Sequence, residues 1–244
     1  MLIVKKAMRE EEAKGLLAVW ADIDEDYRVE YEKFLSCEHM ADRVTIPGFH
    51  AGHRYQGIGE APVFFIFYET SDSEVLRSKP YLRSLNNPSP WTRESIRHLR
   101  NTVRTIYNLL ATEGKRPPLE APYLFVHRFN PEPGSERDVI RWYQGEYLPA
   151  VCNLPGVYRG RLYESDPEIS NLMTEERKVH GAGSGEQRFL AIYEISSLDL
   201  CTGENWPKAA RGNERGESML KKLIRVNGEF YWHGFTMYAP ETDW

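Results

Sequence analysis

The sequence contains two copies of one pattern, and this duplication constrains the fold more than any other feature. At an offset of 108 residues, "EHMADRVTIPG" (38–48) aligns with "EYLPAVCNLPG" (146–156) without a gap. The alignment continues from "FFIFYETSD" (64–72) to "FLAIYEISS" (189–197) once 17 residues are inserted in the second copy. A chain of 244 residues has room for two such units. The sequence therefore predicts two tandem copies of one structural unit rather than two unrelated domains.

Each copy predicts the same succession of strands and helices. In the first helix, Tyr27, Tyr31 and Phe34 recur at three- and four-residue spacing, which is typical of an amphipathic helix. Pro47 and Gly48 end this helix, because proline cannot continue it and glycine tolerates a reversal of the chain. The order strand, helix, strand, strand, helix, strand is the ferredoxin-like motif. The predicted elements of the first copy are strands at 15–22, 48–57, 61–70 and 104–111 and helices at about 28–45 and 89–101. Those of the second copy are strands at 122–130, 155–164, 187–195 and 229–238 and helices at about 135–152 and 205–225.

The duplicated motif predicts how the two copies assemble. An antiparallel sheet with helices on one face leaves its other face in need of cover, and two such sheets can cover each other. We predict an α+β fold in which duplicated ferredoxin-like βαββαβ units, residues 1–114 and 115–244, form an intramolecular α/β barrel. The second copy carries an insertion at about 165–186, which is polar and rich in glycine and predicts a mobile surface loop.

Composition and charge exclude several classes of function. The net charge of −5 argues against a nucleic-acid platform, which needs a surplus of Lys and Arg on one face. No apolar run approaches a membrane span, and the first fifteen residues are too charged for a signal peptide. Cys37, Cys152 and Cys201 are far apart and match no metal or disulfide motif. We therefore expect a cytoplasmic protein with reduced thiols that binds a small molecule, with a homodimer as a further option.

The repeated pattern resembles a known superfamily. Glu38-His39 near the end of the first helix and Pro47-Gly48 before the second strand are similar to the dimeric α/β-barrel superfamily, and within it to EthD-like proteins. The segment 68–94 also looks like the connection between the third strand and second helix of larger members. This resemblance implies a pocket in each half, either between sheet and helices or inside the barrel. The superfamily includes cofactor-free isomerases, cyclases, decarboxylases, oxygenases and lyases, besides haem enzymes, so the fold alone does not select the reaction.

Three of the seven histidines lie in the segment 38–55. On a regular strand, His50 and His53 point to opposite faces, so they cannot together bind one metal. His39 lies at the edge of the buried stripe of the first helix, where it could share a pocket with one of them. An imidazole beside a carboxylate titrates near neutrality, which suits proton transfer. We predict His39 as the general acid or base, Glu38 as its orienting neighbour, and His50 or His53 as a second proton-transfer group. The alternative is that His39 is a partly exposed helix residue.

Further residues are candidates for substrate binding. Arg54 or Arg93 would hold an anionic group, because arginine binds carboxylates in a bidentate manner. Trp91 and Tyr55 would contribute aromatic surface to the pocket. The alternative for Trp91 is that it fixes its loop onto the core. In the second copy, Arg128, Arg159 and Arg161 could bind a carboxylate, with surface ion pairing as the alternative.

The two copies differ at the candidate residues. Where the first copy has His39, His50 and His53, the second has Tyr147, Tyr158 and Arg161. Because a duplicated barrel needs only one working pocket, we predict that the N-terminal copy is the active half.

These observations lead to a predicted function with two alternatives. No nucleotide-binding loop, GxSxG or HExxH motif is present, so we expect neither a metal nor another cofactor. We predict a cofactor-independent acid/base enzyme, a lyase, isomerase or decarboxylase of catabolism, acting on a small aromatic or unsaturated metabolite that bears a carboxylate. One alternative is a non-catalytic small-molecule-binding or stress-response barrel. The other is a haem-dependent oxidoreductase similar to chlorite dismutases, with His180 or His233 as the haem ligand. A metal held by Glu38, His39 and one strand histidine is a further, less specific option.

Overall fold

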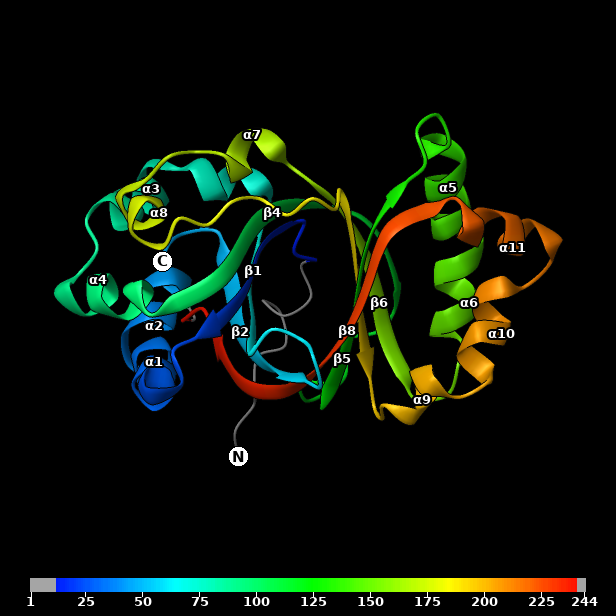
Figure 1. Cartoon of the computed structure of the whole chain (residues 1–244), viewed down its shortest axis with the longest axis horizontal. Coiled ribbons are helices and arrows are strands. Elements are labelled where there is room, and N and C mark those ends of the chain that lie inside the picture. The colour runs from blue at the N-terminus through cyan, green and yellow to red at the C-terminus, as the bar shows by residue number, and fades with distance from the viewer. Residues whose placement is uncertain (1–11, 241–244) are drawn as a thin grey trace.

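The computed structural model describes residues 12–240, in which eight antiparallel strands form one closed barrel flanked by helices (Figure 1). The strands are β1 (Gly15–Ile23), β2 (Phe49–Ile58), β3 (Phe64–Thr70), β4 (Leu99–Gly114), β5 (Tyr123–Pro131), β6 (Val157–Ser165), β7 (Phe189–Ile195) and β8 (Leu223–Tyr238). The helical elements of the first half are η2 (Glu25–Tyr27), α1 (Arg28–Phe34), η3 (Leu35–His39), α2 (Met40–Val44), η4 (Ser73–Arg77), α3 (Lys79–Asn86) and α4 (Pro90–Arg97). Those of the second half are α5 (Glu136–Trp142), η5 (Tyr143–Tyr147), α6 (Leu148–Cys152), α7 (Pro167–Ser170), α8 (Glu175–His180), α9 (Asp199–Thr202), α10 (Asn205–Arg211) and α11 (Glu214–Lys221). Within this described part of the chain, no helix has the length and apolarity required to cross a membrane.

The strand order confirms the predicted duplication and barrel. Around the barrel the order is β1-β3-β2-β8-β5-β7-β6-β4, so each half contributes one ferredoxin-like sheet, β4-β1-β3-β2 or β8-β5-β7-β6. Antiparallel pairs β2–β8 and β4–β6 join the two sheets, and the barrel therefore closes within one chain. The proposed boundary after residue 114 lies between β4 and β5. Figure 1 shows α1–α4 on one side of the strands and α5, α6 and α9–α11 on the other.

The inside of the barrel is a packed core rather than a cavity. Trp20, Phe65 and Tyr231 are almost completely buried there, with further aromatic and aliphatic side chains from all parts of the barrel. Charged groups among these rings are paired: Arg161 donates to Glu69 at 2.6 Å. Burying a charge is tolerable only when it is paired and hydrogen-bonded. Of the two pocket locations that the family resemblance implied, the barrel interior is thus occupied by side chains of residues 12–240.

The first long helix of each half is interrupted at the same position by a π-helical turn. These turns are η3 and η5, and they lie 108 residues apart, as the sequence repeat does. A π-turn adds one residue to a turn of the helix and changes the directions in which its side chains point. Such turns are common at functional sites. In the first half the last residue of the turn is His39. Gly48 and Gly156 follow with φ of 92° and 93°, a left-handed conformation that favours glycine.

The second helices are shorter than predicted. The predicted helix 89–101 ends at Arg97, and the predicted helix 205–225 is divided into α10 and α11. Gly212, with φ of 60°, separates these two helices. The fourth strands begin correspondingly earlier, and Asn101 and Arg225 both have φ of 51° at equivalent places near their starts. Neither residue is a glycine, and sequence reasoning did not predict these bends.

The insertion in the second half is not the predicted free surface loop. Its helices α7 and α8 pack on the first half, where α8 contacts α3 and α4 (Figure 1). Arg177 fixes its path by donating to the carbonyl groups of Ser170, Leu172 and Ala182 at 3.0–3.2 Å. Two of its polar side chains, Arg177 and Glu176, thus fix the backbone of the segment and bind the first half.

Candidate active site

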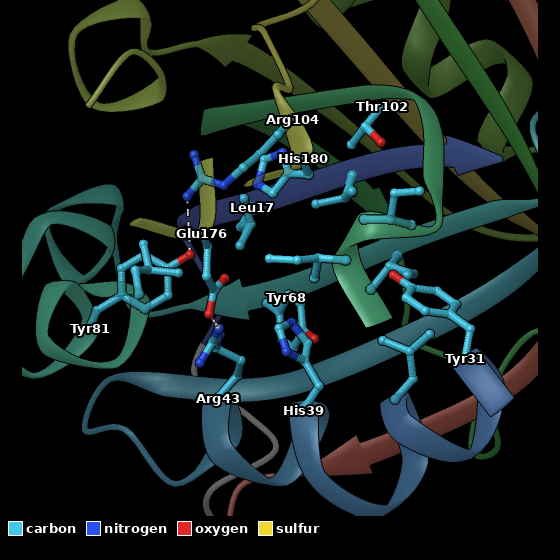
Figure 2. Close-up of a pocket in the computed structure, with 16 residues that line it drawn as sticks. Leu17, Tyr31, His39, Arg43, Tyr68, Tyr81, Thr102, Arg104, Glu176 and His180 are labelled. Carbon is cyan, nitrogen blue, oxygen red and sulfur yellow. Dashed lines mark hydrogen bonds and ion pairs between the residues drawn. The ribbon is translucent and has the colours of Figure 1, made fainter. Parts of the chain in front are cut away.

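A pocket lies between the outer face of the first half-sheet and the helices that cover it (Figure 2). Its cavity volume is about 60 Å³, and with the adjoining space that is open to solvent it reaches about 560 Å³. Strands β1, β3 and β4 line one side, and the helical run α1–η3–α2 lines the other. The inserted helix α8 completes it, so the second half supplies part of a pocket in the first. Most of the surface is apolar, from residues such as Leu17, Leu35, Ile66, Leu85, Ile96 and Leu99.

Three polar atoms in this pocket are buried and make no hydrogen bond to any described residue. They are Nδ1 of His39, Oη of Tyr68 and Oγ1 of Thr102. Leaving one buried polar group unsatisfied costs about 1–3 kcal/mol, so native proteins rarely do so without a bound molecule. Three such atoms around one space could form hydrogen bonds to water or to a polar-substituted ligand bound there.

His39 is a neutral imidazole in this environment. The π-turn η3 directs it into the pocket, where its ring packs 5.1 Å from that of Phe34. Burial, together with the positive charge of Arg43 and the neighbouring His180, holds the pKa of His39 well below its usual value of 6.5. At neutral pH the ring therefore has a free lone pair with which it can accept a proton.

The inserted helix brings a second imidazole to the pocket. Nδ1 of His180 accepts a hydrogen bond from the backbone N–H of Ala182 at 3.0 Å. Burial, with the charges of Arg104 and Arg177, lowers the pKa of His180 to about 4. The ring is thus neutral, and because Nδ1 is an acceptor, the proton resides on Nε2. Figure 2 shows His39 pointing into the pocket from its helix, while Arg104 and His180 project from the opposite side.

A buried ion pair attaches the inserted helix to the first half. Arg43 of α2 and Glu176 of α8 approach to 2.5 Å, and their side chains are only 4% and 8% exposed. Arg43 also donates to the hydroxyl group of Ser84. The charge of Arg43 is therefore compensated within the protein, and the ion pair links α2 to α8 across the pocket.

Of the predicted catalytic residues, only His39 lines the pocket. Glu38 does not orient it: the Glu38 carboxylate accepts hydrogen bonds from the hydroxyl groups of Ser89 and Thr92 at 2.5 and 3.1 Å. Ser89 is the N-cap residue of α4 and Thr92 lies in its first turn, where a carboxylate interacts favourably with the helix dipole. Glu38 therefore fixes α4 against the first helix.

The structure does not bring His39 together with His50 or His53, contrary to expectation. A register shift between Phe49 and Ala51 breaks the regular alternation of β2, so Phe49 packs under the helices while His53 points into the barrel. His53 stacks on Phe67 at 4.5 Å, and its Nδ1 lies 3.0 Å from Oγ1 of Thr236. The sheet itself thus separates His53 from the pocket of His39.

His50 lies at the bulge, outside the pocket. Its Nε2 is 2.9 Å from the hydroxyl oxygen of Ser71, at the end of β3. The backbone carbonyl of His50 accepts from Ala239. This histidine therefore belongs to the junction between β2, β3 and the end of β8.

The predicted substrate-binding residues also lie elsewhere. Arg54 donates to the backbone carbonyl of Glu32 at 3.0 Å, and Tyr55 donates to the carbonyl of Ala121 inside the barrel. Trp91 packs on Phe34 with ring centroids 5.6 Å apart. It therefore fixes its loop to the core, as the alternative interpretation of this residue stated. Arg93 is exposed on α4.

Sequence reasoning missed most polar residues of the pocket, among them Tyr68, Thr102, Arg104 and, in this role, His180. A signal for two of them existed, because Thr102, Arg104 and Ile106 alternate along β4 and share one face. No local signal could show that the insertion carrying His180 docks on the other half.

Aromatic side chains fill the corresponding space in the second half. The positions of Leu35 and His39 are taken by Tyr143 and Tyr147, whose rings stack at 4.5 Å. At the position of Tyr68, Tyr193 bonds the Tyr143 hydroxyl group at 2.5 Å. Trp206 packs edge-on against Tyr193 at 4.9 Å. The larger rings therefore replace the pocket with a closed core.

Comparison with known proteins identifies the architecture. No family model and no curated protein matches the sequence. Among solved structures, an anthrone oxidase-like protein superimposes with a TM-score of 0.66 at 12% identity, covering 95% of both chains. The chain has a chlorite dismutase-like fold, a fused dimeric α/β barrel. A proposed monooxygenase from Fusobacterium nucleatum matches with a TM-score of 0.58 at 9% identity, over 95% of this chain and 98% of that one. A chlorite dismutase from Candidatus Nitrospira defluvii matches at 0.56 and 10% identity, over 96% of both chains.

These similarities establish the barrel fold and leave the activity open, because identities this low do not carry function. The resemblance to EthD-like proteins in particular has no matching family model and stays a prediction. Distant structural relatives of this chain are named as oxidoreductases.

The described residues do not fit a haem group. The pocket beside His180 has a cavity volume of about 60 Å³, far less than a tetrapyrrole requires. His233 lies in an open surface groove with its Nε2 2.9 Å from the Thr236 hydroxyl oxygen. In the second half, Tyr143, Tyr147 and Trp206 occupy the space between sheet and helices. Within residues 12–240, no group of three His, Cys, Asp or Glu side chains is arranged to hold a metal ion, and Glu38, His39 and the strand histidines are not brought together.

Proposed function

We propose that this protein is an enzyme in which His39 removes a proton from a small, ring-containing molecule, and that the resulting anion reacts with dioxygen. The observation that carries the proposal is the buried, unpartnered Nδ1 of His39 in a largely apolar pocket. A general base must lie within hydrogen-bond reach of the proton that it takes, and here the base faces the space that a substrate would fill.

The first step needs only groups of the pocket. An acidic O–H or activated C–H of the substrate gives its proton to His39, and the electron pair stays on the substrate as a phenolate or enolate. The low pKa of His39 keeps the base unprotonated before the step. Once the anion forms beside it, the opposite charge stabilises the imidazolium ion and raises its pKa. The free hydroxyl groups of Tyr68 and Thr102 are placed to donate hydrogen bonds to the developing charge.

The oxidative step is supported by the kind of anion and by the structural relatives. An electron-rich enolate or phenolate can react with dioxygen without a further cofactor, forming a carbon–oxygen bond. In balanced form, a ring CH₂ group and O₂ give a ring carbonyl group and H₂O, with the proton on His39 returned as water leaves. An anthrone oxidase-like protein and proposed monooxygenases share this fold.

Isomerase, lyase or decarboxylase chemistry would begin with the same proton transfer and would omit dioxygen. Two measurements separate the cases on a panel of single-ring hydroxylated aromatic compounds. Anaerobic exchange of substrate hydrogen for solvent deuterium reports the first step, and oxygen consumption reports the second. A protein that only binds its ligand would show neither.

His39→Gln is the decisive variant. It should lower the exchange rate by roughly 10²–10⁴-fold, which is the usual contribution of a general base. His50→Gln is the matched control, because this partly buried histidine lies outside the pocket, and it should exchange at the parent rate. Exchange that persists in His39→Gln would show that another group is the base.

A further inference from the structure

One cation of the pocket has no carboxylate partner within the described part of the chain. Arg104, a half-buried residue of β4, donates to Oη of Tyr81 at 3.0 Å, a neutral group. No acidic side chain between residues 12 and 240 lies within ion-pair distance of it. The other pocket arginine, Arg43, is by contrast neutralised by Glu176. Figure 2 shows the Arg104–Tyr81 and Arg43–Glu176 contacts as separate pairs.

His180 provides a second donor near Arg104. Its Nδ1 accepts from Ala182, so its Nε2 carries a hydrogen, and this N–H makes no hydrogen bond to another described residue. Arg104 is close enough for its charge to disfavour protonation of this ring. A guanidinium fork and an imidazole N–H therefore face the same end of the pocket.

The two halves differ at this position of the sheet. In the first half Arg104 pairs with Val19 of β1, and in the second half Gly228 pairs with His127 of β5 at the equivalent place. Gly228 has a ring of Phe125 within 3.1 Å of where its Cβ would lie. The free cation thus belongs to the half that contains the pocket, and the half with the filled core lacks it.

We infer that this pocket selects ring-bearing carboxylates, with the carboxylate bound by Arg104 and the Nε2–H of His180 and the ring lying against the apolar side near His39. The inference rests on the proposed function and names its substrate class. Arginine is suited to this task because its planar fork binds a carboxylate through two parallel hydrogen bonds. A bound anion would neutralise the one pocket charge that the described protein groups leave uncompensated. Arg104 thus takes the role expected for Arg54 or Arg93.

Benzoate and benzamide test this inference without any turnover. They have the same ring and nearly the same shape, and they differ in charge. Calorimetric titration of the full chain should show benzoate binding at least about tenfold more tightly than benzamide, a difference of about 1.4 kcal/mol. Arg104→Gln should abolish the preference, and Arg104→Lys should keep part of it because the charge remains without the fork. Arg97→Gln, an exposed change on α4 close in sequence, is the control and should keep the full preference.

Two results would overturn the inference. One is equal binding of the two probes, or no binding of benzoate at millimolar concentration. The other is a preference for benzoate that survives in Arg104→Gln. Circular dichroism of each variant verifies that it is folded. The proposed function is judged separately, by deuterium exchange in His39→Gln, so a protein can fail one test and pass the other.

Discussion

The ion pair between Arg43 and Glu176 gives the sharpest test of how the two halves are joined. Glu176→Gln keeps the size of the side chain and removes its charge. The Arg43 guanidinium, 4% exposed, would then be buried beside an amide and the Ser84 hydroxyl group. Removing one partner of a buried pair costs about 3–5 kcal/mol, because the other charge is left uncompensated. The glutamine oxygen can still accept one hydrogen bond, so we expect the lower end of that range.

A loss of about 3 kcal/mol is a large part of the 5–15 kcal/mol by which such proteins are stable. Urea denaturation should show it as a lower midpoint with an unchanged slope. If the inserted segment opens locally, the penalty is relieved there first, and amide hydrogen exchange should accelerate in residues 166–188 before the barrel strands respond. Replacing both partners together, with Arg43→Met and Glu176→Leu, should restore much of the loss, since no charge is then buried alone.

Glu175→Gln is the matched control for this prediction. Glu175 precedes Glu176, lies at the surface and pairs with Lys178 at 2.6 Å. Its replacement should leave both the denaturation midpoint and the exchange of the segment unchanged. A Glu176→Gln protein with the parent's denaturation midpoint and hydrogen-exchange pattern would show that this ion pair does not hold the inserted segment.

Two further outcomes follow from the packing and from the buried histidines. Leu35→Tyr places in the first half the ring that Tyr143 provides in the second, and it should abolish benzoate binding. The barrel should stay folded, with overpacking lowering the free energy of unfolding by about 1–3 kcal/mol. Undiminished calorimetric binding would contradict the placement of the site. His127 is buried with its pKa lowered to about 4, whereas an unfolded histidine titrates near 6.5. The unfolded chain therefore binds this proton first, so stability is lost as the pH falls from about 6.5 towards 4, and His127→Phe should flatten the pH dependence of the free energy of unfolding in that window. An equally steep decline in His127→Phe would show that this residue does not contribute.

The sequence alone determined the architecture, because the repeat consists of local features, such as helix ends and apolar spacing, that occur in both copies. Pro47-Gly48 and Pro155-Gly156 end the first helices, and both glycines adopt the left-handed conformation that this reversal needs. Alternating apolar residues indicated the strands, and apolar residues at three- and four-residue spacing indicated the helices, which together give the order of the elements. A ferredoxin-like sheet with one bare face has few ways to cover it, and a second copy on the same chain is the nearest cover. The sequence also indicated which copy is unusual, since His39 stands where the other copy has Tyr147.

The tertiary structure alone decided which side chains meet. A one-residue shift of register after Phe49 interrupts the alternation of side chains along β2. Every residue after such a shift points to the opposite face from the one that regular alternation predicts. His53 thereby entered the barrel core instead of the pocket. The docking of the insertion likewise depends on contacts between segments more than a hundred residues apart, such as Arg43 with Glu176. Local sequence patterns report the conformation of a segment, whereas a binding site depends on the surfaces that distant segments present to each other, and these form only when the chain has folded.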